Sequence, residues 1–318
     1  MAVIASALNS LQLVVDEEVA ALQLNQFPML NRIQKKTISQ KAIKWNVNAS
    51  GAAVTGEATT ANVTTYSEDS VVSAQLAIGA NRLRHSFQIQ KEDIAEAKAA
   101  GKGALRDLFG YEIQSGIRVL MESLSGLLYT GAGAASDGGL IGLTTAVPTT
   151  AGAYAGIAAS ALWNPYVNHN ATARALSLAL LLDIEAGMVT KGATFSAVYT
   201  TPAMVVKYKT LFNTNTGITN ILEAGKADLG YTGVAYAGRP VIQDPYCTPN
   251  AMYFLNESEV SLYTFAQNNT SGNQGMQFAI EQLPSSNPDA ENYAILVKPQ
   301  LQLKNRPKAA ALLSNVGA

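Results

Sequence analysis

Two segments near the amino-terminal end alternate between apolar and polar side chains. They are residues 42–47 and 72–78. The apolar positions are Ile43, Trp45 and Val47 in the first segment, and Val72, Ala74, Leu76 and Ile78 in the second. A period of two predicts strands that place one face against a core.

The connection between these strands, residues 49–70, is long and has few apolar side chains. Its large apolar residues are Val54, Val63 and Tyr66. Ordering a chain costs ~1–2 kcal/mol per residue, and so few apolar groups do not offset that cost. Two interpretations remain: a surface loop without fixed structure, or a β-arm whose tip lies on another subunit. We favour the β-arm.

Apolar residues spaced three and four apart predict helices. Over residues 3–24 this spacing predicts an amphipathic helix, or an arm that becomes helical against a partner. The broadest apolar stripe covers residues 103–129 and predicts a helix of ~40 Å. Residues 91–100 predict a shorter helix, which Gly101 separates from the long one.

The rest of the pattern mixes helices and strands without strict alternation. We expect helices at 173–188 and 202–212, strands at 194–200, 238–245, 277–282 and 293–303, and a hairpin that joins 252–255 to 260–265. This mixture predicts an α+β fold with antiparallel strands.

Charged side chains are scarce, at 14% of the 318 residues, against ~25% in typical soluble domains. Because charged groups usually cover a protein surface, we infer that much of this exterior becomes interior when copies of the chain assemble. The net charge of −1 gives the chain as a whole no electrostatic attraction to nucleic acid. Both ends are nevertheless basic, because no acid lies between Glu18 and Glu57 or after Glu291.

Candidates for catalysis or metal binding are few. His85 and His169 lack a partner at metal-ligand spacing, and Cys247 is the only cysteine, which fits a reducing cytoplasm. We interpret this thiol as buried, or as having no catalytic role. No signal peptide, membrane span, phosphate-binding loop or nucleophile elbow occurs, and the carboxylates form no evident acid/base pair. We therefore assign no catalytic, cofactor-binding or metal-binding residue.

The order of these elements resembles the major capsid proteins of tailed bacteriophages, whose HK97-type fold is shared with encapsulins. The sequence matches that carry the resemblance are Ala-Gly-Arg-Pro-Val-Ile-Gln-Asp at 237–244, Met-Tyr-Phe-Leu-Asn at 252–256 and Val-Ser-Leu-Tyr at 260–263. The strand and helix expected over 194–212 are similar to the central lobe of that family. The order of elements covers nearly the whole chain.

The resemblance implies a division of the chain into four parts. They are an N-terminal arm (1–40), an extended β-hairpin or E-loop (41–80), a peripheral domain with the long spine helix (81–150 and 266–318), and an axial domain (151–265). In the family, the extended loop lies over an adjacent subunit and the axial domains gather at fivefold and sixfold vertices.

The resemblance also implies a function and partners. The chain would self-assemble, as pentamers and hexamers, into an icosahedral virion capsid that encloses the viral genome, formed in the host cytoplasm. Expected partners are scaffolding and portal proteins, a cement protein and double-stranded DNA held without base readout, with no membrane. Candidate inter-subunit contacts are Leu8, Leu11, Val54, Val63 and Tyr66. Candidate genome-facing residues are Arg32, Lys35, Lys36, Lys304 and Arg306.

Three alternative classes remain at this point. An encapsulin-type compartment would have the same fold around a cargo enzyme. A soluble α/β enzyme would need a site that the motifs do not reveal. A surface-layer or tail-tube protein would share the low charge, but the expected helices and the missing signal peptide disfavour both.

Overall fold

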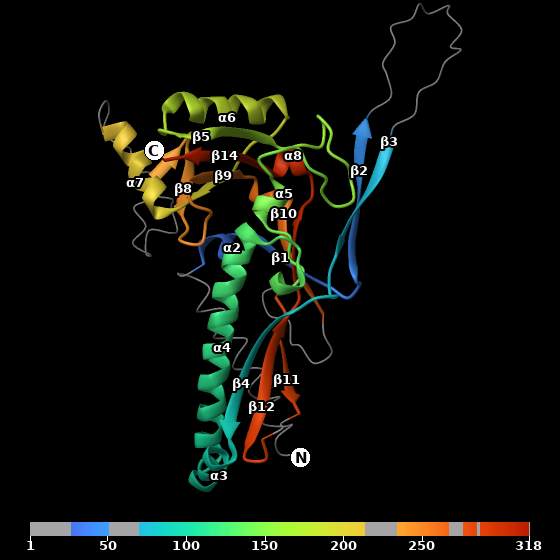
Figure 1. Ribbon diagram of the computed structural model, residues 1–318, viewed down its shortest axis with the longest axis vertical. Helices are drawn as coiled ribbons and strands as arrows, with labels where there is room; N and C mark the ends of the chain where they lie inside the picture. Colours follow the sequence, from blue (N-terminus) through green and yellow to red (C-terminus); the bar gives the residue numbers. More distant parts are fainter. Residues whose placement is uncertain (1–26, 51–69, 214–233, 267–275, 285–286, 318) are drawn as a thin grey trace, which may run out of the picture.

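The computed structural model describes residues 27–50, 70–213, 234–266, 276–284 and 287–317 (Figure 1). Its helices are α2 (Pro28–Arg32), α3 (Lys91–Ala100), α4 (Lys102–Thr130), α5 (Leu143–Ala146), α6 (Leu178–Thr190), α7 (Pro202–Asn213) and α8 (Arg306–Ala309). Its strands are β1 (Gln34–Ile38), β2 (Ala42–Ser50), β3 (Ser70–Ala77), β4 (Leu83–Gln90), β5 (Tyr166–Arg174), β6 (Ala197–Thr200), β7 (Val234–Tyr236), β8 (Arg239–Gln243), β9 (Ala251–Leu255), β10 (Val260–Phe265), β11 (Ala279–Leu283), β12 (Ala290–Val297), β13 (Pro299–Leu303) and β14 (Ala310–Val316).

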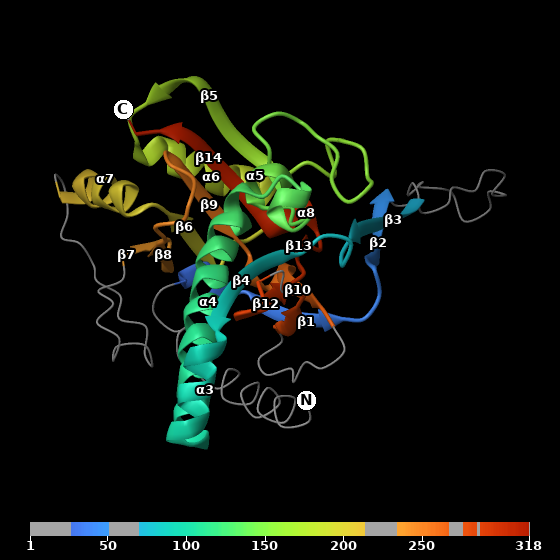
Figure 2. The ribbon, with the colours of Figure 1, turned by 60° about the horizontal axis from the view of Figure 1, so that its bottom comes forward.

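A six-stranded mixed sheet lies at one end of the molecule, in the order β5-β14-β9-β6-β8-β7 (Figure 2). The pairs β5–β14 and β6–β8 are parallel and the others are antiparallel. One face packs Val198 and Phe254 against α6 and α7. The opposite face places Tyr199 and Tyr253 in the main core, which continues into the rest of the molecule. The central strands β6 and β9 are therefore buried on both sides.

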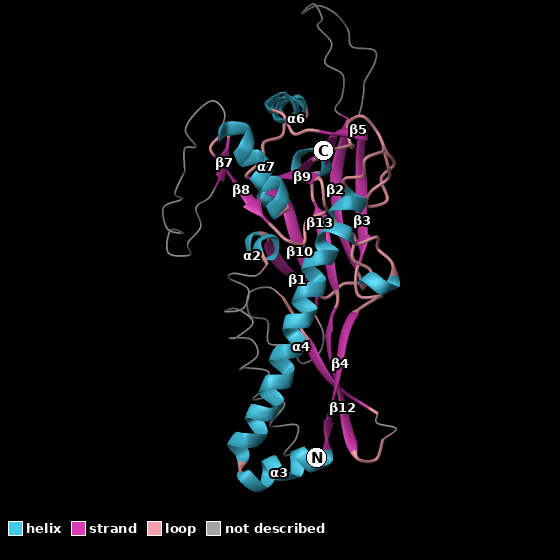
Figure 3. Cartoon of the chain, turned by 60° about the vertical axis from the view of Figure 1, so that its left-hand side comes forward, coloured by secondary structure: helices cyan, strands magenta, loops and turns pink. Residues whose placement is uncertain are grey.

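The long helix α4 runs beside the sheet β11-β12-β4 (Figure 3). Its apolar stripe is buried, including Ile113, Ile117 and Leu124. Gly116 is a point of close approach, because a Cβ there would lie 2.7 Å from the side chains of His85 and Ile295. The helix therefore depends on a glycine to pack against the strands.

The predicted break between the two helices is confirmed at Gly101. This residue has φ of +118°, in the region that favours glycine. α3 ends before it and α4 begins after it. The long helix itself spans one residue more at each end than the expected 103–129.

The two predicted alternating strands are also confirmed. They are β2 and β3, which pair antiparallel as a two-stranded ribbon. Ile43 faces Leu76 across the ribbon, and both side chains are buried in the core. Beside the ribbon, β1 pairs parallel with β10, and β10 pairs antiparallel with β13.

Three sequence-based expectations were wrong in detail. The segments 252–255 and 260–265 form no hairpin, because β9 lies in the six-stranded sheet and β10 pairs with β1 and β13. The expected strand 293–303 is two strands in different sheets, β12 and β13. The helix expected from residue 173 begins at Leu178, because the preceding residues form strand β5 against β14.

Several other elements were missed or lie outside the described residues. The pattern did not indicate β1, β4, β5 or β14 as strands. The predicted helix at 3–24 and the contact candidates Leu8, Leu11, Val54, Val63 and Tyr66 lie outside the described residues. Within the described residues, no helix is long and apolar enough to cross a membrane.

Candidate functional site: the anchored amino-terminal segment and the basic strands

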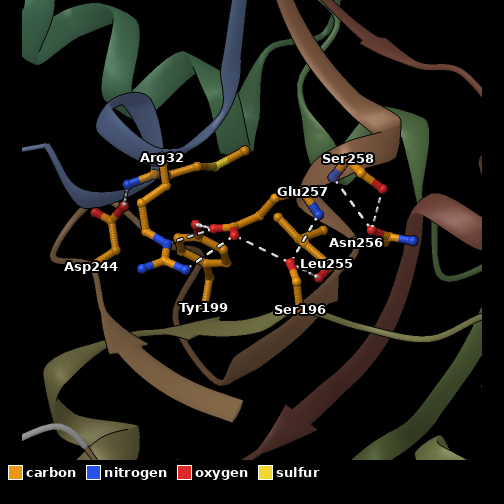
Figure 4. Close-up of polar contacts among 9 residues, drawn as sticks. Arg32, Ser196, Tyr199, Asp244, Leu255, Asn256, Glu257 and Ser258 are labelled. Atoms are coloured by element: carbon orange, nitrogen blue, oxygen red, sulfur yellow. Dashed lines mark hydrogen bonds and ion pairs between the residues drawn. The ribbon is translucent and has the colours of Figure 1, made fainter. Parts of the chain in front are cut away.

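An ion pair fastens the segment before β1 to the body of the protein (Figure 4). Arg32, at the end of α2, places its Nε 2.6 Å from Oε1 of Glu257 and its Nη2 3.1 Å from Oε2. Glu257 also accepts hydrogen bonds from the hydroxyls of Tyr199 and Ser196. Both charged side chains are mostly covered, at 23% and 17% exposed. This contact joins residues 225 positions apart.

The electrostatics of Glu257 follow from these neighbours. Burial alone would raise the pKa of its carboxyl group. The hydrogen bonds from Arg32 and Tyr199, with the charge of Arg32, outweigh burial and hold the pKa below its usual value. The carboxylate is therefore charged at neutral pH and binds the arginine bidentately, which is the strong form of this contact.

A second carboxylate contacts the same amino-terminal segment. Asp244, after β8, is buried and accepts a hydrogen bond of 2.8 Å from the hydroxyl of Tyr129, at the end of α4. It also accepts from the backbone N–H of Tyr246 at 3.0 Å and of Met29 at 3.4 Å. Burial raises the pKa of Asp244, against the opposing effect of these hydrogen bonds. Asp244 thus joins α2, α4 and the loop after β8.

The ribbon β2–β3 is tied to the body at several points. The indole Nε1 of Trp45 donates to the carbonyl of Lys304 at 2.8 Å. The backbone N–H of Gln75 donates to the carbonyl of Ala155 at 2.9 Å. No third strand joins the ribbon among the described residues, so its outer backbone edges have no strand partner there.

Arg306, expected to face the genome, is fully buried in this chain. Its Nε donates to the carbonyl of Ala146 at 2.7 Å, and its Nη1 donates to that of Gly152 at 2.8 Å. The guanidinium lies over the ring of Tyr154, 5.5 Å from its centroid. Burial lowers the pKa of Arg306 to about 10. The residue holds the loop after α5 in place, and the expectation that it contacts DNA is corrected.

The other basic candidates divide into covered and exposed residues. Arg32 forms an ion pair with Glu257, which neutralises its charge within the chain. Lys35 is half-buried, and burial lowers its pKa to about 8. Lys36 and Lys304 are exposed.

The fold brings the two acid-poor ends of the sequence together. β1 carries Lys36 and pairs with β10, which pairs with β13 from the carboxyl-terminal end. The Nζ atoms of Lys36 and Lys298 lie over the rings of Tyr263 and Phe265, at 5.7 and 5.2 Å from the centroids. The sheet β1-β10-β13 therefore carries a basic face with aromatic rings.

Within the described residues, no group of three histidine, cysteine or acidic side chains could hold a metal ion. His169 lies 2.8 Å from the hydroxyl of Ser314, which gives it a structural hydrogen bond. Cys247 is buried, as predicted, and burial raises the pKa of its thiol. The contacts of these residues hold segments of the chain together.

Comparison with protein families decides the class of the protein. The family described as SU10 major capsid protein matches residues 6–317. The chain belongs to this family. It is a phage major capsid protein that self-assembles into the viral shell of the virion, and it is not an enzyme. The predicted role as a capsid shell protein, the location in the virion and the family resemblance are thereby confirmed.

Solved structures support the same fold. The chain is similar to the capsid asymmetric unit of Cyanophage A-1(L), at 23% identity and a TM-score of 0.77, over 92% of this chain and 93% of that chain. It is also similar to the capsid of a native GTA particle, at 11% identity and a TM-score of 0.62, over 92% of both chains. At these identities the likeness shows the fold alone, a mixed α+β fold of the HK97-like type.

An encapsulin has the same fold. The holo-SrpI encapsulin complex from Synechococcus elongatus PCC 7942 matches at 11% identity and a TM-score of 0.62, over 91% of this chain and 86% of that chain. No curated protein sequence matches the chain. The fold therefore does not separate a capsid from an encapsulin, and the family match makes that distinction.

In this capsid protein, the contacts of Arg32 and Met29 hold the amino-terminal segment against the body of the subunit. Sequence reasoning missed Glu257 and Asp244, which hold the amino-terminal segment. One signal was available for Asp244 alone, because it closely follows the apolar strand 240–242 in the sequence Pro-Val-Ile-Gln-Asp, whereas Glu257 stands in the polar turn Asn-Glu-Ser-Glu. Arg32 and Tyr129, which pair with Glu257 and Asp244, lie more than a hundred residues away in sequence, so spacing could not identify these pairs.

Proposed function

We propose that this chain forms an icosahedral shell of pentamers and hexamers around double-stranded DNA, and that the ribbon β2–β3 joins adjacent subunits. The observation that carries the second part is the ribbon itself. Its inner face packs Ile43 and Leu76 into the core, and its backbone edges meet no third strand among the described residues. Figure 1 shows the ribbon beside the body. A two-stranded ribbon is marginally stable alone, and a neighbouring subunit would supply the missing contacts.

We further propose the four-part division of the chain, with one adjusted boundary. The arm covers 1–40, the extended loop 41–80, the peripheral domain 81–150 and most of 266–318, and the axial domain 151–265. Strand β14 pairs with β5 and β9 inside the six-stranded sheet. This pairing supports assigning residues 310–316 to the axial domain instead of the peripheral domain.

The proposed contact with DNA rests on the exposed Lys36 and Lys304, and on the half-buried Lys35 that precedes Lys36 in β1. Lysine side chains at a surface neutralise phosphates without reading bases, and such binding weakens as salt increases. The burial of Arg306 and the ion pair of Arg32 support leaving these two out. Scaffolding, portal and cement proteins remain proposed partners, and Leu8, Leu11, Val54, Val63 and Tyr66 remain proposed contacts between subunits.

Electron microscopy of the overexpressed full chain, with a scaffolding protein supplied where needed, tests the shell. We expect closed particles from the wild-type chain. Inserting two prolines after Val71, which is 60% exposed at the outer end of β3, should leave the body folded, by circular dichroism, but prevent closed particles, because proline removes ladder hydrogen bonds. Normal shells from the insertion variant would contradict the role of the ribbon. A wild-type chain that stays monomeric or dimeric with scaffold present would contradict the shell.

A further inference from the structure

The loop between α5 and β5 carries a tight turn at residues 154–157. Tyr154 and Ile157 each donate a backbone hydrogen bond of 3.0 Å to the carbonyl of the other. The two central residues, Ala155 and Gly156, have φ of +55° and +78°. Positive φ at both central positions is the mark of a type I′ turn, whose first position usually holds asparagine, aspartate or glycine. Alanine there is a strained residue, and such residues persist only where the surroundings hold them.

Arg306 clamps the chain that leads into this turn. Its side chain is fully buried, and its Nε and Nη1 donate to the carbonyls of Ala146 and Gly152. Its Nη2 has no hydrogen-bond partner in the described part of the chain. From the other side, the hydroxyl of Tyr154 accepts from the backbone N–H of Leu303 in β13 at 3.0 Å. Burying a charge that hydrogen-bonds only to backbone carbonyls is costly, which favours a role in holding this loop in one place.

The turn holds the edge of β3 that faces away from β2. The backbone N–H of Gln75 donates to the carbonyl of Ala155 at 2.9 Å, and the carbonyl of Ala77 accepts from Nε2 of Gln300 at 2.8 Å. The N–H of Ile78, one position further, instead bonds within the ribbon, as the alternation of an antiparallel pair requires. Figures 1 and 2 show this loop, in light green, beside the ribbon. The inner part of this edge is therefore bonded to the body of the subunit.

We propose that the turn at 154–157 is a strut that fixes the direction in which the ribbon leaves the subunit, and that Arg306 and Ala155 are positioning residues for assembly. The bond from Gln75 lies between the base of the ribbon and its outer end, so it limits how far the ribbon swings. The inference rests on the proposed role of the ribbon between subunits and adds what aims it. Without the strut, ribbons would meet their neighbours at unequal angles, and shells would close with irregular curvature.

Distances between two spin labels in the unassembled subunit test the strut directly. The labels are placed at Asn48→Cys, exposed on β2, and at Val189→Cys, exposed on α6, while the native Cys247 is buried. Gln75→Pro removes the N–H that binds Ala155 but no ladder bond, and proline is tolerated on such an edge. We expect the distance distribution to broaden and its mean to shift.

Ser73→Pro is the matched control for this substitution. Ser73 lies two residues from Gln75 on the same edge of β3, so its N–H also points away from β2. Because the turn does not bind this N–H, the distance distribution should keep its original width. Broadening as large as that of Gln75→Pro would assign the effect to proline itself and count against the strut.

A second variant acts on the turn instead of the ribbon. Gly156→Val places a β-branched side chain at φ of +78°, where it is strongly disfavoured, and a Cβ at this position meets nothing within 4 Å. It therefore disturbs the backbone of the turn without a clash. Ala155→Gly keeps the carbonyl that Gln75 binds and accepts positive φ, so it should assemble as the wild type does.

Particle shape is the readout that a purely structural role would not move. Gln75→Pro and Gly156→Val should each lower the yield of closed particles of wild-type diameter about tenfold, the equilibrium equivalent of one hydrogen bond. Open or misshapen particles should replace them, while circular dichroism of the subunit stays unchanged. A contact that only stabilised the subunit would lower its unfolding midpoint and leave particle diameter as it is.

Two results would overturn the proposal. An unchanged distance distribution in both Gln75→Pro and Gly156→Val would show that the turn does not aim the ribbon. Wild-type yields and diameters from both variants would show that its aim does not matter for assembly. Absence of particles from the wild-type chain would instead contradict the capsid function, and the spin-label measurement on single subunits would still decide whether the strut exists.

Discussion

Removing Arg32 should destabilise the subunit measurably. The Arg32→Ala substitution takes away two hydrogen bonds, of 2.6 and 3.1 Å, from Glu257. A hydrogen bond to a charged group contributes ~1.5–3 kcal/mol, and breaking a buried pair costs up to ~3–5 kcal/mol. The two side chains are about one fifth exposed, and the hydroxyls of Tyr199 and Ser196 remain as donors. We therefore expect a loss of about 2–3 kcal/mol in the free energy of unfolding.

Urea unfolding of unassembled subunits at neutral pH measures this loss. Arg82→Ala is the matched control, because the Nη1 atom of Arg82 lies 3.8 Å from Oε2 of Glu281 with both side chains 46% exposed. An exposed pair of that kind contributes ~0–1 kcal/mol. The double variant Arg32→Ala with Glu257→Gln completes a cycle, and we expect it to be less destabilised than the sum of the single changes.

The pH dependence gives a second measure of the same contact. The pKa of Glu257 is held below its usual value, so its contribution is present above the unfolded-state pKa of ~4.3 and is lost as pH falls through the folded-state pKa. The difference in stability between the wild type and Arg32→Ala should therefore shrink at acidic pH. An Arg32→Ala variant with a wild-type urea midpoint at neutral pH would refute the anchoring role.

Three further predictions concern buried groups. Burial raises the pKa of Asp244, so wild-type stability should gain a contribution as pH falls toward acid, and Asp244→Asn should lack that gain in urea unfolding. An unchanged pH profile would contradict this. Gly131→Ala, just after the end of α4, should destabilise by ~1–3 kcal/mol, because its Cβ would lie 2.5 Å from the carbonyl oxygen of Leu140, whereas Gly126→Ala, in open space within α4, should be neutral or stabilising. Equal thermal midpoints for the two glycine variants would count against the packing argument. Cys247 should react with a thiol reagent only after unfolding, and rapid reaction in the folded subunit would show that the loop around it opens.

Local periodicity was enough to predict the ribbon and the long helix. The alternation over 42–47 and 72–78 corresponds to β2 and β3, whose paired residues Ile43 and Leu76 bury one face. The stripe over 103–129 corresponds to α4. These elements follow from sequence because each has a repeat of its own, which marks one face as buried whatever the neighbours are.

Strand pairing was less accessible to sequence. Segments 252–255 and 260–265 are adjacent and apolar, which suggested a hairpin, yet β9 and β10 pair in different sheets. Short apolar strands carry no signal that chooses one partner over another. Similarly, β5 has mostly exposed side chains, and only its backbone pairing with β14 makes it a strand. Non-local hydrogen bonding decides such cases.

The sequence by itself indicated a shell subunit, because low charge, few candidate catalytic groups and the order of elements all favour one, and the match to the capsid family over residues 6–317 decided the class. The tertiary structure decided which charged residues are available for contact. Arg32 and Arg306 look like surface cations in the sequence, but one is paired with Glu257 and the other is buried among backbone carbonyls. The physical reason is that burial and pairing depend on residues far away along the chain, which meet only after folding.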